Sequence, residues 1–459
     1  MSLQFLADYT SSSKHDCPIW TIATSSKVVW SASADGAIKA WDINSGRSIG
    51  SIQSPHRNAV TSLSVSESQG WMTTNSLDGS LALWKIQSFH DQQTRLPKVD
   101  DLVAARGASS PTQEGDRNEA TESMVPPNGE NSRALKDEAQ EVTSCLAYCP
   151  SVARMAFPGE RTPFPIDAYT SDLHPNKPIL ATTGNTASLS LYRITVDNLA
   201  STNDSQEQSP LSTFLTPLRR FRANAVIHPK DHASASSATR SLARNPIPTS
   251  ARKGWGMCVR FTPAGSMVAV GTDSGQVIVH DVESGAVIAL FSNHAAPIRS
   301  LSFSLAPVLG SVNSAAAPLS GHRGSSGSSS LSDLERRLDH LSVGSEDLTL
   351  SVHDARDLRE QGQQASGTVV AMLQGHAKMV VDASIRGDGR ILASTSTDKT
   401  IKLWDLAASP KVCVCTIAED GAMWCLRWIN DGKFVAAGDQ GVVRWYRGAG
   451  VGTSAGEDL

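Results

Sequence analysis

The sequence predicts an all-β fold made of repeated four-stranded units. A motif recurs along the chain in which an acidic turn residue stands six positions before an aromatic or histidine residue. Alternation of apolar and polar residues, which is typical of strands, surrounds the copies. Stretches rich in Ser, Gly and Pro separate some of them, and aromatic residues make up only 5% of the 459 residues. We therefore expect a closed β core diluted by long insertions.

The clearest repeat begins at Gly375-His376 and ends at Trp404-Asp405. A GH start, an alternating stretch, a tight acidic turn and a closing WD are the signature of one blade of a WD-repeat β-propeller. The six-residue spacing occurs at Asp35/Trp41, Asp78/Trp84, Asp347/His353, Asp398/Trp404 and Asp439/Trp445. Two degenerate copies lead to Tyr192 and to His280, the second with Ser274 in the acidic position. The sequence therefore predicts seven blades.

A single domain over residues 1–459 follows from this count. The blades are expected at approximately 12–52, 53–90, 161–197, 251–293, 294–310 plus 342–360, 370–410 and 411–450. The opening strand at 3–8 is expected to close the last blade, because closure by both chain ends removes an exposed sheet edge. Insertions are expected at 91–160, 198–250 and 311–341 as long loops.

One insertion carries a helix signal. Ser332-Asp333-Leu334-Glu335 forms a capping box, and Leu338 and Leu341 follow at helical spacing. These features predict a short amphipathic helix over 332–341 that docks either beside its own blade or on a partner.

Within the clearest blade, polar residues are expected to form a hydrogen-bonded chain, which we call the blade staple. The predicted members are His376, Asp398, Trp404 and Ser394, with Ser396 as the alternative hydroxyl. The role is structural, because buried polar groups need partners. Blades three to five lack the WD dipeptide, having Tyr192-Arg193, His280-Asp281 and His353-Asp354, so a weaker staple is expected there.

A partner-binding surface is expected at the mouth of the central channel, where the inner strands begin. Trp, Met and Arg are enriched at binding hot spots, and they recur at the expected strand starts. The predicted surface residues are Trp20, Val60, Trp255, Met257, Arg299, Val381, Trp424 and the nearby Trp445.

Composition argues against several other classes of function. The chain has 41 basic and 45 acidic residues, a net charge of −4, so neither direct nucleic-acid nor membrane binding is expected. Arg219-Arg220-Phe221-Arg222 is either a small RNA contact or, the preferred reading, a solvated strand face. No nucleotide-binding, nucleophile or metalloprotease motif occurs, so neither catalysis nor a cofactor is expected.

The seven cysteines do not have the spacing of a disulfide framework or a zinc site. No metal is expected. This cysteine usage predicts a reducing compartment, either the cytoplasm or the nucleus. The chain start has no basic region followed by an apolar stretch, which a secretory signal would require.

Four segments resemble the WD-repeat subunit of the eukaryotic superkiller complex, a family also known for meiotic recombination in fungi. The resembling segments are His15-Asp16-Cys17-Pro18-Ile19-Trp20, Val282-Glu283-Ser284-Gly285 with Pro297-Ile298-Arg299-Ser300-Leu301-Ser302-Phe303, Met379-Val380-Val381 with Trp404-Asp405, and Val443-Arg444-Trp445-Tyr446-Arg447-Gly448-Ala449-Gly450. The likeness covers the seven blades and omits the three insertions. The last segment is the most specific of the four.

The resemblance implies a non-catalytic scaffold. Members of the family join a tetratricopeptide-repeat scaffold subunit and an RNA helicase, in a complex that feeds messenger RNA to the cytoplasmic exosome for 3′-to-5′ decay. Fungal members are similarly linked to the protein that makes meiotic double-strand breaks. Two rival readings stay open: a substrate receptor of a cullin-type ubiquitin ligase, loosely suggested by His353-Asp354-Ala355-Arg356, and a transcription-elongation cofactor.

Overall fold

The computed structural model describes most of the predicted blades and parts of the connections between them. The described residues are 4–52, 54–86, 143–149, 154–159, 164–165, 168–185, 188–195, 214–221, 254–306, 337–359 and 368–449.

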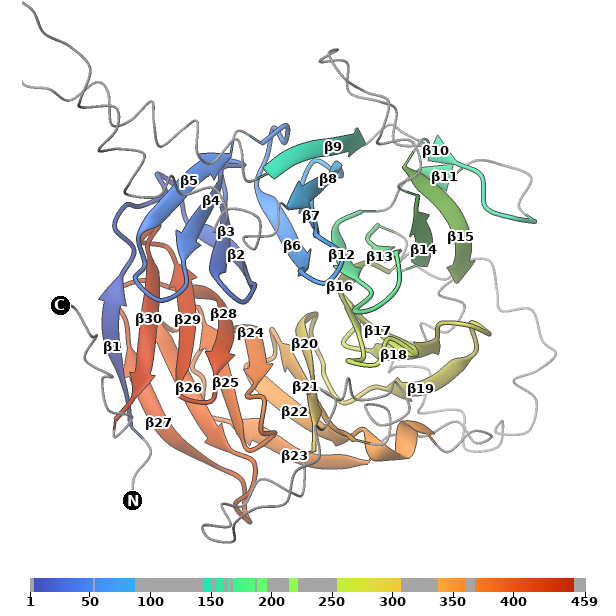
Figure 1. Ribbon diagram of the computed structural model, residues 1–459. Helices are drawn as coiled ribbons and strands as arrows, with labels where there is room; N and C mark the ends of the chain where they lie inside the picture. Colours follow the sequence, from blue (N-terminus) through green and yellow to red (C-terminus); the bar gives the residue numbers. More distant parts are fainter. Residues whose placement is uncertain are drawn as a thin grey trace, which may run out of the picture.

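The strands form a ring of four-stranded antiparallel sheets around a central axis, which is the axis of the predicted channel (Figure 1). Seven such sheets are present in the described part of the chain, so the prediction of an all-β, seven-bladed propeller is confirmed. In blades 1 to 6 the first strand lies nearest the centre of the ring and the fourth lies on the circumference, and in blade 7 these places are taken by β28 and β1.

Blades 1 to 4 follow the chain in order. Blade 1 contains β2 (Ile19–Thr24), β3 (Val28–Ser33), β4 (Ile38–Asp42) and β5 (Ser48–Ile52). Blade 2 contains β6 (Val60–Ser66), β7 (Trp71–Ser76), β8 (Leu81–Ile86) and β9 (Thr143–Cys149). Blade 3 contains β12 (Thr170–Leu173), β13 (Ile179–Thr183), β14 (Leu189–Ile194) and β15 (Leu215–Phe221). Blade 4 contains β16 (Gly256–Phe261), β17 (Met267–Thr272), β18 (Val277–Asp281) and β19 (Val287–Phe291).

Blades 5 to 7 complete the ring. Blade 5 contains β20 (Ile298–Leu305), β21 (Leu338–Ser345), β22 (Thr349–Asp354) and β23 (Val369–Gln374). Blade 6 contains β24 (Val380–Ile385), β25 (Ile391–Ser396), β26 (Thr400–Asp405) and β27 (Val412–Ala418). Blade 7 contains β28 (Met423–Asn430), β29 (Lys433–Gly438), β30 (Val443–Gly448) and β1 (Phe5–Thr10). A two-stranded sheet, β10 (Arg154–Met155) with β11 (Phe164–Pro165), and the 3₁₀-helix η3 (Arg356–Arg359) lie outside the blades.

The two ends of the described chain meet in blade 7. Strand β1 pairs antiparallel with β30, with Phe5 opposite Gly448 and Thr10 opposite Arg444. The Phe5 ring packs edge-on against Trp428 at 5.7 Å. Because this pairing gives β30 its outer neighbour, it removes the sheet edge that would otherwise stay open.

The predicted insertion boundaries are wrong at three places, because strands lie inside the predicted loops. Strand β9 lies within 91–160, β15 lies within 198–250, and β21 begins at Leu338 within 311–341. In blades 2 and 3 the long connection separates the third strand from the fourth, so the outer strand comes only after it.

Leu338 and Leu341 belong to strand β21 and not to a helix. Both side chains are buried against blade 4. The capping box at Ser332 to Glu335 lies outside the described residues.

The predicted ranges 370–410 and 411–450 each join strands of two blades. Strand β23 pairs with β22 of blade 5, and β27 pairs with β26 of blade 6. The sequence repeat is therefore offset from the blade by one strand, because the strand before the GH motif belongs to the preceding sheet.

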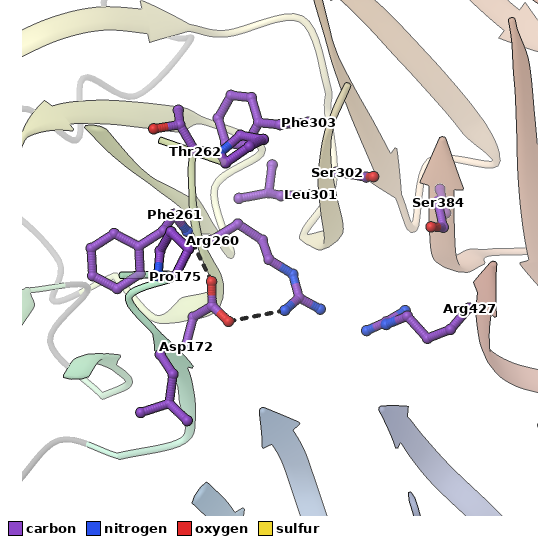
Figure 2. A pocket seen from close by; sticks show the side chains of 13 residues that line it. Asp172, Pro175, Arg260, Phe261, Thr262, Leu301, Ser302, Phe303, Ser384 and Arg427 are labelled. Atoms are coloured by element: carbon purple, nitrogen blue, oxygen red, sulfur yellow. Dashed lines mark hydrogen bonds and ion pairs between the residues drawn. The ribbon is translucent and has the colours of Figure 1, made fainter. Parts of the chain in front are cut away.

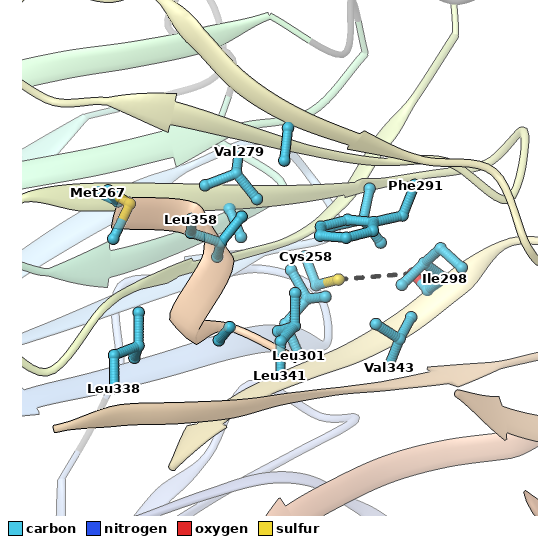
Figure 3. Close-up of a cluster of buried hydrophobic side chains, with 14 residues drawn as sticks. Cys258, Met267, Val279, Phe291, Ile298, Leu301, Leu338, Leu341, Val343 and Leu358 are labelled. Atoms are coloured by element: carbon cyan, nitrogen blue, oxygen red, sulfur yellow. Dashed lines mark hydrogen bonds between the residues drawn. The ribbon is translucent and has the colours of Figure 1, made fainter. Parts of the chain in front are cut away.

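The hydrophobic core consists of separate layers of side chains, each of which lies between two neighbouring blades. Figure 3 shows one such layer, where Met267 and Val279 of blade 4 meet Leu341 and Val343 of blade 5, with Leu358 of η3 over the edge. Because the strands carry apolar side chains on both faces of a blade, each blade can pack against both of its neighbours around the ring.

Polar side chains on the inner strands also connect neighbouring blades. The Ser64 hydroxyl accepts a hydrogen bond from Leu173 N at 3.1 Å, and the Asp172 carboxylate accepts one from Phe261 N at 2.9 Å. The Ser302 hydroxyl in the corresponding place accepts from Ile385 N at 3.2 Å. These bonds satisfy backbone groups next to the channel, where no further strand pairs with them.

Within the described residues there is no helix of the length and apolar character that spanning a membrane requires.

Candidate functional site

The channel mouth is built by one irregularity repeated around the ring. In six inner strands the pairing register skips the second residue, which is a β-bulge. In blade 3, Tyr169 holds the same place, directly before Thr170 at the start of β12. We call these seven residues the mouth ring: Trp20, Thr61, Tyr169, Met257, Arg299, Val381 and Trp424.

All seven members of the mouth ring are half-buried, between residues that are buried in the blades or their approaches. A bulge re-aims a side chain relative to the ordinary pleat. The fold therefore presents one partly exposed side chain from each blade at the same level of the channel.

Five of the eight predicted surface residues belong to the mouth ring: Trp20, Met257, Arg299, Val381 and Trp424. Trp255 lies two residues before Met257, at the approach to β16, and is 42% exposed. It meets the Tyr169 ring edge-on at 6.0 Å.

Val60 is not part of this surface. It is fully buried, and the exposed position is taken by the next residue, Thr61. An error of one residue reverses the direction of a strand side chain, which explains why the prediction failed here.

Trp445 is also not part of the surface. It is fully buried between blades 7 and 1, donates its Nε1 proton to Ile43 O at 2.9 Å, and stacks on Tyr9 at 5.0 Å. Its role is therefore packing of the closing blade.

A spacing in the sequence, which we did not use above, marks several mouth ring positions. In the four blades with a buried starting histidine, the ring residue stands five positions after His15, His56, His294 or His376. Counting five positions would have selected Thr61 in place of Val60. Tyr169 follows no such histidine, so only the structure reveals it.

Aromatic side chains occupy two sectors of the mouth. Trp20 and Trp424, from neighbouring blades 1 and 7, lie 6.2 Å apart between ring centroids. Tyr169, Trp255 and Met257 form the second sector, across blades 3 and 4. Flat aromatic surfaces of this kind suit a hydrophobic side chain or a peptide backbone.

Polar contacts hold several of these side chains in place. Trp424 Nε1 donates to Asp439 Oδ1 at 2.7 Å, and Arg299 Nε donates to Glu346 Oε1 at 2.6 Å. Thr61 Oγ1 donates to Tyr169 O at 2.5 Å. Because little side-chain freedom remains to be lost, a partner would bind at a lower entropic cost.

The blade staple is complete in blade 6. Asp398 Oδ2 lies 2.9 Å from His376 Nδ1, Ser394 Oγ lies 2.8 Å from His376 Nε2, and Trp404 Nε1 donates to Ser394 Oγ at 2.9 Å. Ser394, and not Ser396, is thus the bridging hydroxyl. Because the Asp398 carboxylate can only accept, a neutral His376 carries its proton on Nδ1, and its Nε2 accepts a hydrogen bond from Ser394 Oγ.

The electrostatics of the staple favour a neutral histidine. Burial lowers the pKa of His376 below its usual value, although Asp398 opposes this. Burial acts to raise the pKa of Asp398, but hydrogen bonds from Thr400, Ala377 N and His376 lower it to about 2. A neutral histidine beside a carboxylate has a structural role here, because both lie inside the blade.

Staples also occur in blades 1, 2 and 5. His15 and Trp41 share Ser31, while His56 and Trp84 share Thr74. Blade 5, where a weaker staple is expected, has its bridging hydroxyl on the third strand. There Ser351 bridges His294 and His353 at 2.8 and 2.7 Å.

In blade 7 a tyrosine–glutamate hydrogen bond takes the place of the staple's tryptophan–hydroxyl hydrogen bond. Tyr446 takes the place of the tryptophan, because it pairs with Phe434 as Trp404 pairs with Leu392. Its hydroxyl donates to Glu419 at 2.6 Å. The predicted match of Asp439 with Trp445 is therefore out of register by one residue.

The basic cluster lies on β15, on the circumference of blade 3. Arg219 donates to Glu283 O and lies 6.0 Å from the Phe221 ring, while Arg222 lies outside the described residues. No group of His, Cys, Asp and Glu side chains in the described ranges has the arrangement of a metal site.

Comparison with known proteins identifies the class. The sequence profile of the WD domain, G-beta repeat family matches residues 46–85 and 367–405. The chain is 26% identical to LEC14B protein of Lithospermum erythrorhizon, over 38% of this chain and 29% of that protein. It is 39% identical to protein transport protein SEC13 of Chaetomium thermophilum, over 15% of this chain and 22% of that protein.

A third relative, nuclear distribution protein nudF 2 of Aspergillus clavatus, is 38% identical over 19% of this chain and 18% of that protein. The chain thus spans less than a third of the length of each of these relatives. The repeat matches and the seven blades together define a WD-repeat protein. Propellers of this class generally serve as scaffolds for protein binding.

Proposed function

We propose that this chain is a scaffold whose channel mouth binds an extended segment of a partner protein through a hydrophobic anchor. The observation that carries this proposal is the mouth ring, which gathers Trp20, Trp424, Tyr169 and Met257 from four blades at one level. Large partly exposed aromatic side chains that are already fixed in place are typical of binding hot spots.

We further propose that the partner is the tetratricopeptide-repeat scaffold subunit of a superkiller-type complex, which also contains the RNA helicase. The support is the sequence resemblance, including the Val443 to Gly450 segment. The relatives with other names share only parts of the repeat region, so they do not favour a rival assembly. In meiotic cells the same mouth would hold the protein that makes double-strand breaks.

The test compares purified complexes from cells that express the tagged chain. Trp255→Ala and Arg299→Ala should each reduce recovery of the tetratricopeptide-repeat subunit, because loss of a hot-spot side chain costs about 1–4 kcal/mol of binding. The matched control is Met372→Ala. The exposed fraction of Met372, 41%, is similar to the 42% of Trp255, but Met372 lies on the outer strand β23.

Mass spectrometry of the recovered proteins separates the outcomes. Recovery of the helicase and the tetratricopeptide-repeat subunit with wild type and Met372→Ala, but not with the mouth variants, is the expected result. Recovery of cullin adaptors or elongation factors in their place would refute the superkiller assignment. Equal recovery with all variants would refute the mouth as the binding surface.

A further inference from the structure

The end of the channel opposite the mouth contains a cavity that the proposed function does not use. It has a volume of about 280 Å³ and is lined by the far ends of the inner strands of blades 3 to 7. Figure 2 shows Arg260 of β16 and Arg427 of β28 extending toward each other across it. The Ser302 and Ser384 side chains lie on the same lining.

The two arginines are held by aspartates of the preceding blades. Arg260 Nη1 lies 3.1 Å from Asp172 Oδ1, and Arg427 Nη1 lies 2.6 Å from Asp382 Oδ2. An arginine has five N–H donors, and each of these contacts uses a single nitrogen of the group. The ion pairs therefore fix the direction of both guanidinium groups without saturating them.

The two aspartates each accept three hydrogen bonds from the protein. Asp172 accepts from Ser64 Oγ, Arg260 and Phe261 N. Asp382 accepts from Ala383 N, Leu426 N and Arg427. Three donors stabilise each negative charge.

The donors that stay open belong to the arginines. Among the described residues, Nε and Nη2 of both Arg260 and Arg427 have no protein acceptor, and neither does the Ser384 hydroxyl. The Arg260 and Arg427 side chains are 32% and 21% exposed. Fixed guanidinium forks next to a hydroxyl match the oxygens of phosphate, which accepts several hydrogen bonds at once.

We propose that this cavity, which we call the arginine cavity, binds a single phosphate group between Arg260 and Arg427. Its volume of about 280 Å³ accommodates a phosphate group together with water. Because each arginine is paired with a carboxylate, the site has no large net charge. We therefore expect weak binding, with a dissociation constant on the order of 1 mM.

The proposal is tested by ³¹P NMR of inorganic phosphate titrated with the full chain. Saturable broadening of the phosphate resonance is expected with wild type. Arg260→Lys and Arg427→Lys keep the charge but lose the planar fork, and each should weaken binding roughly tenfold, since hydrogen bonds to charged groups carry this much affinity. Ser384→Ala removes one hydroxyl and should weaken binding by a few-fold.

The matched control is Arg386→Lys. Arg386 forms a similar pair with Asp388 but does not line the arginine cavity. Phosphate binding should be unchanged in this variant. Thermal unfolding without phosphate should confirm that all four variants are folded. If an arginine variant does not fold, Ser384→Ala still tests the proposal.

A second arm identifies the source of the phosphate group. N-acetyl-phosphoserine amide that binds more tightly than inorganic phosphate would indicate a phosphorylated protein segment, whereas its exclusion would indicate free phosphate. Acetate at the same concentration should not compete. The proposal would be overturned if wild type showed no saturable broadening, if acetate competed as well as phosphate, or if the cavity variants bound phosphate as tightly as wild type. These outcomes do not depend on whether the mouth binds a partner.

Discussion

At the scale of single residues, one-position shifts decide which side chains can function. Val60 and Thr61 are neighbours, yet only Thr61 belongs to the mouth ring. Trp445 and Tyr446 are neighbours too, and they face opposite interfaces of blade 7. Because consecutive strand residues point to opposite sides, a residue type alone does not locate a site.

The staple gives a residue-scale prediction. Ser394→Ala should destabilise the protein by about 2–4 kcal/mol, because His376 Nε2 and Trp404 Nε1 each lose their buried partner. Urea unfolding followed by tryptophan fluorescence measures the change. Thr416→Ala, at an exposed position of the same blade, is the control and should change the free energy of unfolding by less than about 0.5 kcal/mol. Equal effects of the two substitutions would contradict the staple.

At the scale of elements, strands that are distant in sequence complete the blades. Strand β9 pairs with β8 although residues 87–142 separate them, and β15 pairs with β14 after residues 195–214. The entropic cost of closing a loop grows only slowly with its length, so a blade tolerates such insertions. The outer strand is therefore hard to assign to its blade from the sequence, although it pairs normally in the structure.

Strand β1 gives an element-scale prediction. Phe5→Ala should cost about 3–5 kcal/mol, because the ring is buried against Trp428 and Phe434 at the closure of the propeller. Leu6→Ala on the same strand is the control, since Leu6 is 63% exposed and its loss should cost less than about 0.5 kcal/mol. Chemical denaturation measures both. A small effect of Phe5→Ala would mean that β1 does not secure the ring.

At the scale of the whole molecule, buried histidines couple stability to pH. Burial lowers the pKa of His15, His56, His174 and His353 to about 4. In the unfolded chain these groups titrate near pH ~6.5. Between these values the unfolded chain binds protons that the folded chain excludes, so acid favours unfolding.

The pH dependence gives a prediction at this scale. The free energy of unfolding should be constant above pH ~6.5 and fall as the pH decreases toward 4, by about 1 kcal/mol for each of the four histidines between pH 7 and 5.5. Urea midpoints at a series of pH values measure this. Asp398, whose pKa is lowered to about 2, affects stability only at lower pH. A flat profile between pH 7 and 5 would show that the histidines are solvated or already charged.

The sequence alone determined the all-β class, the seven blades and the members of the blade 6 staple, because these depend on local periodicity, turn chemistry and a motif within one blade. It also placed five of the mouth ring residues at the expected starts of the inner strands. The three-dimensional arrangement was needed to place the outer strands β9 and β15, to assign Tyr169 to the mouth ring, to show that Trp445 is buried, and to bring Arg260 and Arg427 face to face. Each of these depends on pairing or proximity between distant segments, and closing the ring brings those segments together in a register that no local pattern encodes.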